Sequence, residues 1–553
     1  MRQYVSLVLL ALPAMLLRAE ERPVPRLAVI IAVDQMRADY LVKFRPYFGE
    51  GGFKRLLEGG ADYQNCHYQQ AVTKTAPGHA TILSGVHANV HGIIGNEWLD
   101  RTTFIQGNAV EDVDSPLVGL PPRVGRSPGG VLEAKAGRSP RNFLGTTVGD
   151  RLKARYGAAA KVFGLADKDR SAILMAGPKA DGAYWTEVGR FVTSTYYRRE
   201  LPAWMVEFNG ARGAAQHFGQ VWDRLLDKSV YDAVQGPDDA PGEQAEDGLP
   251  ITFPKRVDGG KAVISGSFYN AFDHTPWNND WVEDMAERLI EVEHLGEDAT
   301  PDLLCLGFSQ PDKTGHAYGP DSHEIMDSYV RLDRTLAKFF DYLDRKVGLK
   351  HCVIVLTADH GVAPLPEKTQ VTKGAGAAGR IMGAALDGHV NAALDAAFGA
   401  LPENINWWAL RDNSGYHVNP LALHAKDLSV AQVAAKLREA LLVHPMIAAA
   451  YTREQLTAPG PLDAFGEASR LSYFPARSPD VLYIPKPYFI ERALGTTHGT
   501  PYEYDTHVPQ VWFGAGVKPG VHLERVAVED IAPTLAGLLG VDLPPEAKGK
   551  KLF

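Results

Sequence analysis

Aspartate and histidine recur in this sequence at spacings that suit metal binding. Asp359 and His360 are adjacent, and Asp312 precedes His316 by four positions. That spacing lets one helical turn or a tight loop aim both side chains at one ion, and a mixture of carboxylate oxygens and imidazole nitrogens suits zinc. Neither pair by itself is strong evidence for a metal site, so the interpretation depends on further candidate ligands elsewhere in the chain. The candidate ligands are Asp34, Asp312, His316, Asp359, His360 and His498.

Six ligands are enough for two zinc sites with three protein ligands each and open positions. Two neighbouring catalytic metals can clamp the entering and leaving oxygens of a phosphoryl transfer. The density of Asp and His residues therefore indicates phosphoryl-transfer chemistry, and a single metal would leave ligands over.

Thr75 is the candidate nucleophile. It precedes Ala76 and Pro77, and proline suits the first turn of a helix, so the hydroxyl is expected near a helix N-terminus. A threonine there ordinarily acts as an N-cap. Beside a zinc ion, however, the hydroxyl can lose its proton and attack phosphorus, while exposed amides and the helix dipole favour an incoming anion. The motif alone leaves both interpretations open.

Lys168 and Arg170 are the candidate phosphate-binding cations. They are two positions apart, so in an extended chain their side chains point the same way. Arginine offers a planar fork and lysine a point charge, which suits the terminal oxygens of a phosphate monoester. Charged loop residues are usually only solvated. Asn96 adds a neutral donor.

Four apolar runs predict the strands that position these residues, and polar candidates follow each of them. In open parallel sheets ligands bind at the carboxyl edge, so this order brings distant residues into one site. Helical patterns between these runs, such as 322–347, complete an α/β sandwich, with a mostly parallel central sheet and helices on both faces. A further amphipathic helix at 429–443 belongs to a later insert. The runs are 27–33, 162–165, 303–308 and 353–356.

The chain is predicted to hold one catalytic domain, residues 25–553, interrupted by an insert at 185–290 and a cap insert at 364–489. Residues 1–19 combine a basic start, an apolar run and a terminal alanine, which is typical of a cleaved secretory signal. An uncleaved anchor is the alternative. We expect a periplasmic or secreted protein with no stable membrane span after cleavage, and a monomer.

Composition excludes other classes of protein. The net charge of −9 lacks the basic excess that nucleic-acid binding normally requires, so no nucleic-acid partner is expected. The three cysteines, Cys66, Cys305 and Cys352, allow at most one disulfide. The last two lie in apolar runs and are expected to be buried thiols.

With these residues assembled, the chain resembles the alkaline phosphatase superfamily, most closely its secreted zinc-dependent alkaline phosphatases with a threonine nucleophile, the PafA-like branch. The resemblance spans nearly the whole mature chain. It is carried by Val33-Asp34-Gln35-Met36-Arg37, Thr75-Ala76-Pro77-Gly78-His79, Gly95-Asn96, Lys168-Asp169-Arg170, Asp312 to His316, Thr357-Ala358-Asp359-His360-Gly361, His498-Gly499 and Asp530-Ile531-Ala532-Pro533-Thr534-Leu535.

The resemblance implies an alkaline-phosphatase-like fold and two zinc ions per chain. One ion would be held by Asp312, His316 and His498, the other by Asp34, Asp359, His360 and Thr75. Asn96, Lys168 and Arg170 would bind the non-bridging phosphoryl oxygens and occupy the space of a magnesium ion in other branches, so no third metal is expected.

The implied reaction is hydrolysis of small phosphate monoesters through a phosphothreonine, with inorganic phosphate as product and diesters as a side activity. A nucleotide pyrophosphatase or phosphodiesterase is the nearest alternative, since it would share the metals and the threonine but, by resemblance, lack the two cations. A non-catalytic periplasmic protein that binds zinc or phosphate is the alternative from another class.

Overall fold

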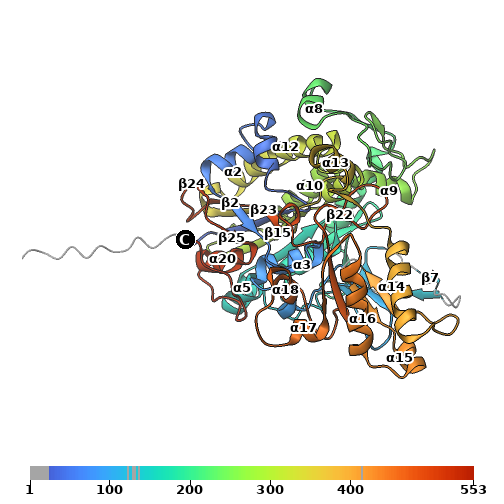
Figure 1. Cartoon of the computed structure of the whole chain (residues 1–553). Helices are drawn as coiled ribbons and strands as arrows, with labels where there is room; N and C mark the ends of the chain where they lie inside the picture. The colour runs from blue at the N-terminus through green and yellow to red at the C-terminus, as the bar shows by residue number, and fades with distance from the viewer. Residues whose placement is uncertain (1–23, 121–123, 127–131, 135–136, 413–414) are drawn as a thin grey trace, which may run out of the picture.

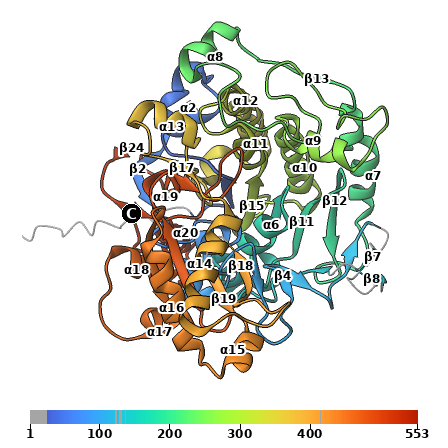
Figure 2. The ribbon, with the colours of Figure 1, turned by 45° about the vertical axis from the view of Figure 1, so that its right-hand side comes forward.

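The computed structural model describes residues 24–120, 124–126, 132–134, 137–412 and 415–553. The predicted signal segment, 1–19, lies outside the described residues. The fold is built on one large central sheet with helices on both faces (Figures 1 and 2).

The centre of the sheet is β1 (Leu27–Val33), which pairs in parallel with β15 (Asp302–Phe308) on one side and β16 (Cys352–Thr357) on the other. β10 (Val162–Ala166) continues the parallel part beside β15. All four are buried along their whole length, which explains why the apolar runs predicted them closely. The sheet order is β24 (Gly520–His522), β2 (Ala61–His67), β23 (His507–Gly514), β16, β1, β15, β10, β11 (Gly182–Glu187), β12 (Arg190–Ser194) and β6 (Leu117–Val118).

Two helical layers enclose this sheet (Figure 1). One contains α2 (Phe53–Gly59), α10 (Trp277–Glu293) and α12 (His323–Lys346), and the other contains α3 (Thr75–Ser84), α5 (Val148–Tyr156), α6 (Asp169–Ala176) and α20 (Ile531–Leu539). α12 begins where the sequence predicts, because the Ser322 hydroxyl accepts a hydrogen bond from the Ile325 amide at 3.2 Å. The predicted α/β sandwich is confirmed.

A second, smaller sheet forms its own core beside the first (Figure 2). Its antiparallel strands are β18 (Trp408–Asp412), β19 (Gly415–Val418), β21 (Val481–Pro485) and β20 (Ile447–Thr452), packed with α14 (Gly383–Phe398) and α16 (Val430–Val443). The insert boundaries stay predictions. β12 and most of α10 fall within the range predicted as the first insert, yet they belong to the central sheet and its helical layer.

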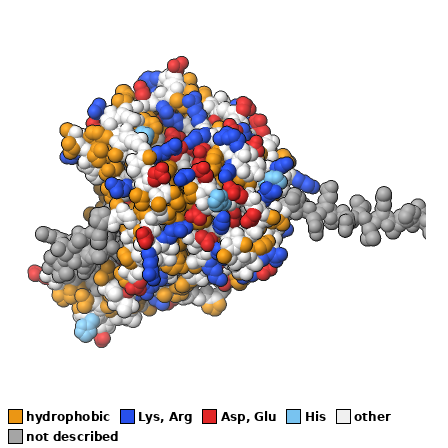
Figure 3. Space-filling model, turned by 180° about the vertical axis from the view of Figure 1, so that it is seen from behind, with side chains coloured by type: hydrophobic (Ala, Val, Ile, Leu, Met, Phe, Trp, Pro, Cys, Tyr) orange, Lys and Arg blue, Asp and Glu red, His pale blue; other side chains and the backbone are white. Residues whose placement is uncertain are grey.

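The three cysteines are buried and free, and Cys305 and Cys352 lie inside β15 and β16 as expected. Among the described residues, no helix combines the length and the apolarity that crossing a bilayer requires. On the face shown in Figure 3, the Lys and Arg side chains of the described residues alternate with Asp and Glu.

Candidate active site

The carboxyl ends of the central strands bring the predicted ligands together. Asp34 directly follows β1. One residue separates the end of β16 from Asp359, which His360 follows. β15 is followed by α11 (Gln310–Tyr318), which carries Asp312 and His316. His498 comes from a later segment without helix or strand and reaches the same place, where its ring stacks on that of His360 with centroids 3.5 Å apart. This is the edge at which parallel sheets bind ligands.

The possible ligand atoms form two groups, each with all its atoms within 4.8 Å of one another: Asp312, His360 and His498 in one, Asp34, His79 and Asp359 in the other. His360 lies between them, because its Nε2 is also 3.2 Å from Asp359 Oδ2. His316 Nε2 is 3.4 Å from Asp312 Oδ1. The structure therefore gathers all six predicted ligands and adds His79.

Main-chain carbonyls orient the imidazole rings. Nδ1 of His316 lies 2.8 Å from Thr496 O, Nδ1 of His360 lies 2.9 Å from Gly361 O, and Nδ1 of His498 lies 2.7 Å from Thr73 O. A carbonyl can only accept, so in each pair Nδ1–H donates and Nε2 of the neutral ring keeps its lone pair. Such donation is the usual way in which a protein orients metal-ligating histidines.

Unpartnered buried atoms show that a cation fits here. Neither carboxylate oxygen of Asp34, nor Asp359 Oδ2, nor His79 Nε2, has a hydrogen-bond partner among the described residues, although these side chains are fully buried. Burial disfavours the charged form of Asp34, but nearby Lys168 and His79 outweigh it and lower the pKa of Asp34 to about 2. A charged, buried carboxylate without hydrogen bonds suits a metal ligand.

Lys168 lies inside the ligand set. Its Nζ is 3.1 Å from Asp34 Oδ2 and also contacts Asp312 Oδ2. Burial lowers the pKa of Lys168, but these two carboxylates outweigh it, so the net pKa is raised and the ammonium stays charged. Lys168 thus balances part of the negative charge of the site.

Arg170 takes a different position from the one that its spacing suggests. α6 begins at Asp169, so Lys168 is the extended N-cap residue while Arg170 is already helical, and the extended-chain argument for a shared direction is wrong. Arg170 Nη1 lies 3.6 Å from Asp169 Oδ1. α6 packs against α3, so Arg170 belongs to a helix that neighbours the one carrying Thr75.

Thr75 is the first residue of α3 and does not cap it. Lys74 holds the N-cap position and no side chain there makes a capping hydrogen bond. The Thr75 side chain is buried, and its Oγ1 lies 3.5 Å from His360 Nε2. The N-cap interpretation is therefore wrong, and the hydroxyl faces the candidate metal groups.

The first turn of α3 offers fewer free amides than expected. Ala76 N–H donates to Asn96 Oδ1 at 2.8 Å, Pro77 has no N–H, and Gly78 N–H donates to Lys74 O at 2.9 Å. An anion must then find its donors mainly in side chains. Because Asn96 Oδ1 is engaged, its NH₂ group is the part that remains to donate.

Comparisons with known proteins identify the family of the chain. Residues 28–507 match the family described as type I phosphodiesterase / nucleotide pyrophosphatase. The chain belongs to this family. The resemblance predicted from the motifs is thereby confirmed, as is the prediction of an enzyme from this superfamily of phosphate-ester hydrolases.

Similar proteins cover nearly the whole chain. "Alkaline phosphatase PafA" of Elizabethkingia meningoseptica is 33% identical over 546 residues, 96% of this chain and 94% of that protein. "Alkaline phosphatase PhoV" of Synechococcus elongatus is 31% identical and covers 95% of this chain and 92% of its own. The crystal structure of wild-type PafA superposes with a TM-score of 0.86 at 32% identity, covering 96% of this chain and 98% of that one. A PafA variant substituted at a threonine, an asparagine, a lysine and an arginine gives 0.87. The predicted alkaline-phosphatase-like fold is confirmed.

Two residues that contact the candidate metal groups were not predicted from the sequence. His79 stands four positions after Thr75, hence on the same face of α3, and this spacing was the available signal. Its Nε2 is 3.3 Å from Asp34 Oδ1. Gln35 follows Asp34 and contacts Asp312 and Asp359, which sequence spacing does not reveal because those partners lie far along the chain.

Proposed function

We propose that this chain is a zinc-dependent phosphatase that hydrolyses phosphate monoesters through a phosphothreonine at Thr75. The observation that carries the proposal is the position of the Thr75 hydroxyl, 3.5 Å from His360 Nε2 and beside two groups of carboxylates and imidazoles. The names of PafA and PhoV, both alkaline phosphatases, support the same activity.

The residues present fit two zinc ions. Imidazoles whose Nδ1–H is held by main-chain carbonyls, together with buried carboxylates, form a mixed nitrogen and oxygen donor set, which zinc favours. Asp312, His316 and His498 would hold one ion, and Asp34, Asp359, His360 and the Thr75 hydroxyl the other. When bound, two zinc ions lower the pKa of a coordinated hydroxyl and neutralise charge on the phosphoryl oxygens.

Thr75 then acts as the nucleophile. Its Oγ forms a bond to phosphorus while the bond from phosphorus to the ester oxygen breaks, and the alcohol leaves after taking up a proton. Water hydrolyses the resulting phosphothreonine, which releases inorganic phosphate and restores the hydroxyl. Since α3 has few free amides, its N-terminus does not supply the main anion contacts.

Asn96, Lys168 and Arg170 would hold the non-bridging oxygens. The threonine and asparagine substituted in the PafA variant are 21 positions apart, like Thr75 and Asn96, and its lysine and arginine are two apart, like Lys168 and Arg170. Bound metals would neutralise the carboxylates that Lys168 now contacts and leave its ammonium for the substrate. With these three residues in place, the proposal needs no third metal.

We further propose that the enzyme is monomeric and is periplasmic or secreted; the signal-like residues 1–19 support the localisation. Its substrates would be small phosphate esters, with some cleavage of diesters. The second candidate, a phosphodiesterase, is favoured by the name of the matching family. A monoester carries one more charged oxygen than a diester, so the two cations are the feature that separates these candidates.

The test compares a matched aryl monoester and diester on zinc-loaded wild type, Lys168→Ala and Arg170→Ala. We expect the wild type to prefer the monoester, and each substitution to lower kcat/KM for the monoester about 10²-fold with a much smaller loss for the diester. Arg170→Ala is the cleaner variant, because no contact joins Arg170 to the candidate ligands within the described part of the chain. Equal losses on both substrates, or a wild type that prefers the diester, would exclude the monoesterase.

A further inference from the structure

Within the described residues, Gln35 is the one residue that hydrogen-bonds to a carboxylate of each candidate metal group, once through its main chain and once through its side chain. Its main-chain N–H donates to Asp359 Oδ1 at 3.0 Å, and its side-chain Nε2 donates to Asp312 Oδ1 at 2.8 Å. It also directly follows Asp34. Gln35 is 2% exposed, so these bonds are shielded from water.

These bonds leave one oxygen of Asp359 for another partner. Asp359 Oδ1 is engaged by the Gln35 amide, whereas Oδ2 has no hydrogen-bond partner among the described residues. On Asp312, the Gln35 amide holds the oxygen that His316 Nε2 and His498 Nε2 also approach, at 3.4 and 3.6 Å. Gln35 thus restricts how both carboxylates can rotate.

The backbone at Gln35 is strained in order to reach these partners. Its φ is 64°, in the left-handed region that non-glycine residues rarely adopt. Strain of this kind persists where the surroundings require it, often at functional sites.

The opposite wall is shaped for the same side chain. A Cβ added to Gly315, which lies on α11 between Asp312 and His316, would stand 1.8 Å from Gln35 Oε1. Because Gly315 has no side chain, the Gln35 amide has room to lie against α11.

We propose that Gln35 is a positioning residue that couples the two metal groups by fixing Asp312 and Asp359 in their ligating orientations. This inference rests on the proposed function, because it requires that both groups bind zinc. Residues that orient metal ligands typically change metal affinity 10- to 100-fold when replaced.

The decisive variant is Gln35→Gly, tested by zinc titration against a competing chelator and by thermal unfolding of the metal-free protein. Glycine accepts a φ of 64° without strain and keeps the N–H that bonds to Asp359, so the bond to Asp359 stays while the side chain and its bond to Asp312 are lost. We expect zinc affinity to fall about 10- to 100-fold while the metal-free protein still unfolds cooperatively near the wild-type temperature, because relief of backbone strain offsets the loss of the buried side chain. Zinc affinity within twofold of wild type would overturn the proposal.

Asp427→Gly is the matched control, since Asp427 caps α15 (Pro420–Lys426) with a φ of 52° in the smaller sheet region. It removes backbone strain of the same kind and should leave zinc affinity unchanged. If the wild type binds no zinc, the proposed function fails. If the wild type and Gln35→Gly bind zinc equally, only the positioning role of Gln35 fails.

Gly315→Ala gives an independent test that does not alter Gln35. Its methyl group should displace the Gln35 amide and lower zinc affinity in the wild-type background, yet have little further effect when combined with Gln35→Gly. Additive losses in the double variant would show that Gly315 serves packing alone and would contradict the coupling.

Discussion

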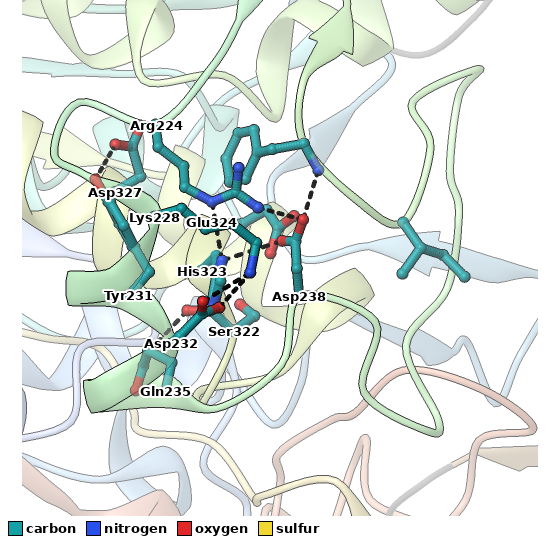
Figure 4. Close-up of polar contacts among 12 residues, drawn as sticks. Arg224, Lys228, Tyr231, Asp232, Gln235, Asp238, Ser322, His323, Glu324 and Asp327 are labelled. Atoms are coloured by element: carbon teal, nitrogen blue, oxygen red, sulfur yellow. Dashed lines mark hydrogen bonds and ion pairs between the residues drawn. The ribbon is translucent and has the colours of Figure 1, made fainter.

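A second buried cluster of charged residues joins residues 222–238 to α12 (Figure 4). It differs from the candidate metal site in how its carboxylates are hydrogen-bonded. Asp34 at the sheet edge has ion-pair contacts with Lys168 and His79, at 3.1 and 3.3 Å, but no aligned hydrogen bond among the described residues, whereas Asp327 on α12 accepts four. The four donors are Tyr231 OH at 2.6 Å, Trp222 Nε1 at 2.7 Å, Arg331 Nε at 2.7 Å and Leu225 N at 2.8 Å. A satisfied carboxylate holds a structure together, while an unsatisfied one is free to bind a ligand.

Glu243, near the second cluster, shows that a missing hydrogen bond alone does not make a carboxylate a metal ligand. Like Asp34 it is buried, and neither of its oxygens has a hydrogen-bond partner among the described residues. Burial, with the neighbouring charge of Glu324, raises the pKa of Glu243 to about 9, so it stays protonated at neutral pH. Asp34 remains charged because Lys168 and His79 surround it. Surrounding charge therefore decides which unpartnered carboxylate can serve a cation.

The largest expected effect is on catalytic activity, which should depend on the candidate metal site and not on the second cluster. Asp34→Asn should lower kcat/KM of the zinc-loaded enzyme about 10³-fold or more, since a charged ligand is lost. Asp327→Asn, the same change in the other cluster, should leave the activity of the folded protein unchanged. Steady-state kinetics on matched amounts of folded protein measure both. Equal losses would mean that the two clusters do not differ in role.

Stability should show the reverse pattern. Asp327→Asn turns two of the four donors toward an NH₂ group, and we expect the free energy of unfolding to fall by about 2–3 kcal/mol. Asp232, whose side chain is 40% exposed and paired with Lys228, is the matched control. Asp232→Asn should cost less than about 0.5 kcal/mol in urea unfolding. A similar cost for both would show that burial at Asp327 contributes little.

The effect expected at Glu243 depends on pH. Because its folded pKa, about 9, exceeds the ordinary 4.5, the folded protein holds a proton that the unfolded chain has lost between these values. Unfolding then releases a proton, so stability falls as pH rises from about 4.5 to 9. Glu243→Gln removes this dependence and should stabilise the protein by up to about 5 kcal/mol at pH 8, with little change at pH 4.5. Thermal unfolding at both pH values measures it, and an identical gain at both would refute the assignment.

Much of this site could be read from sequence because buried parallel strands are continuous apolar runs and their carboxyl ends share one edge. That logic located Asp34, Asp312 and Asp359 without coordinates. It could not locate contacts that depend on register between distant elements, such as the hydrogen bonds of Gln35 to Asp312 and Asp359. Local conformation also escaped it: Thr75 is helical rather than a cap, and Arg170 lies on a helix.

The most direct test of the account is acid quenching of zinc-loaded protein during turnover of a monoester labelled with ³²P, followed by mapping of the labelled peptide. If Thr75 is the nucleophile, the wild type carries label on Thr75, and Thr75→Ala shows neither label nor turnover above about 10⁻³ of wild type. Label on another residue, or Thr75→Ala turning over within tenfold of wild type, would contradict that role.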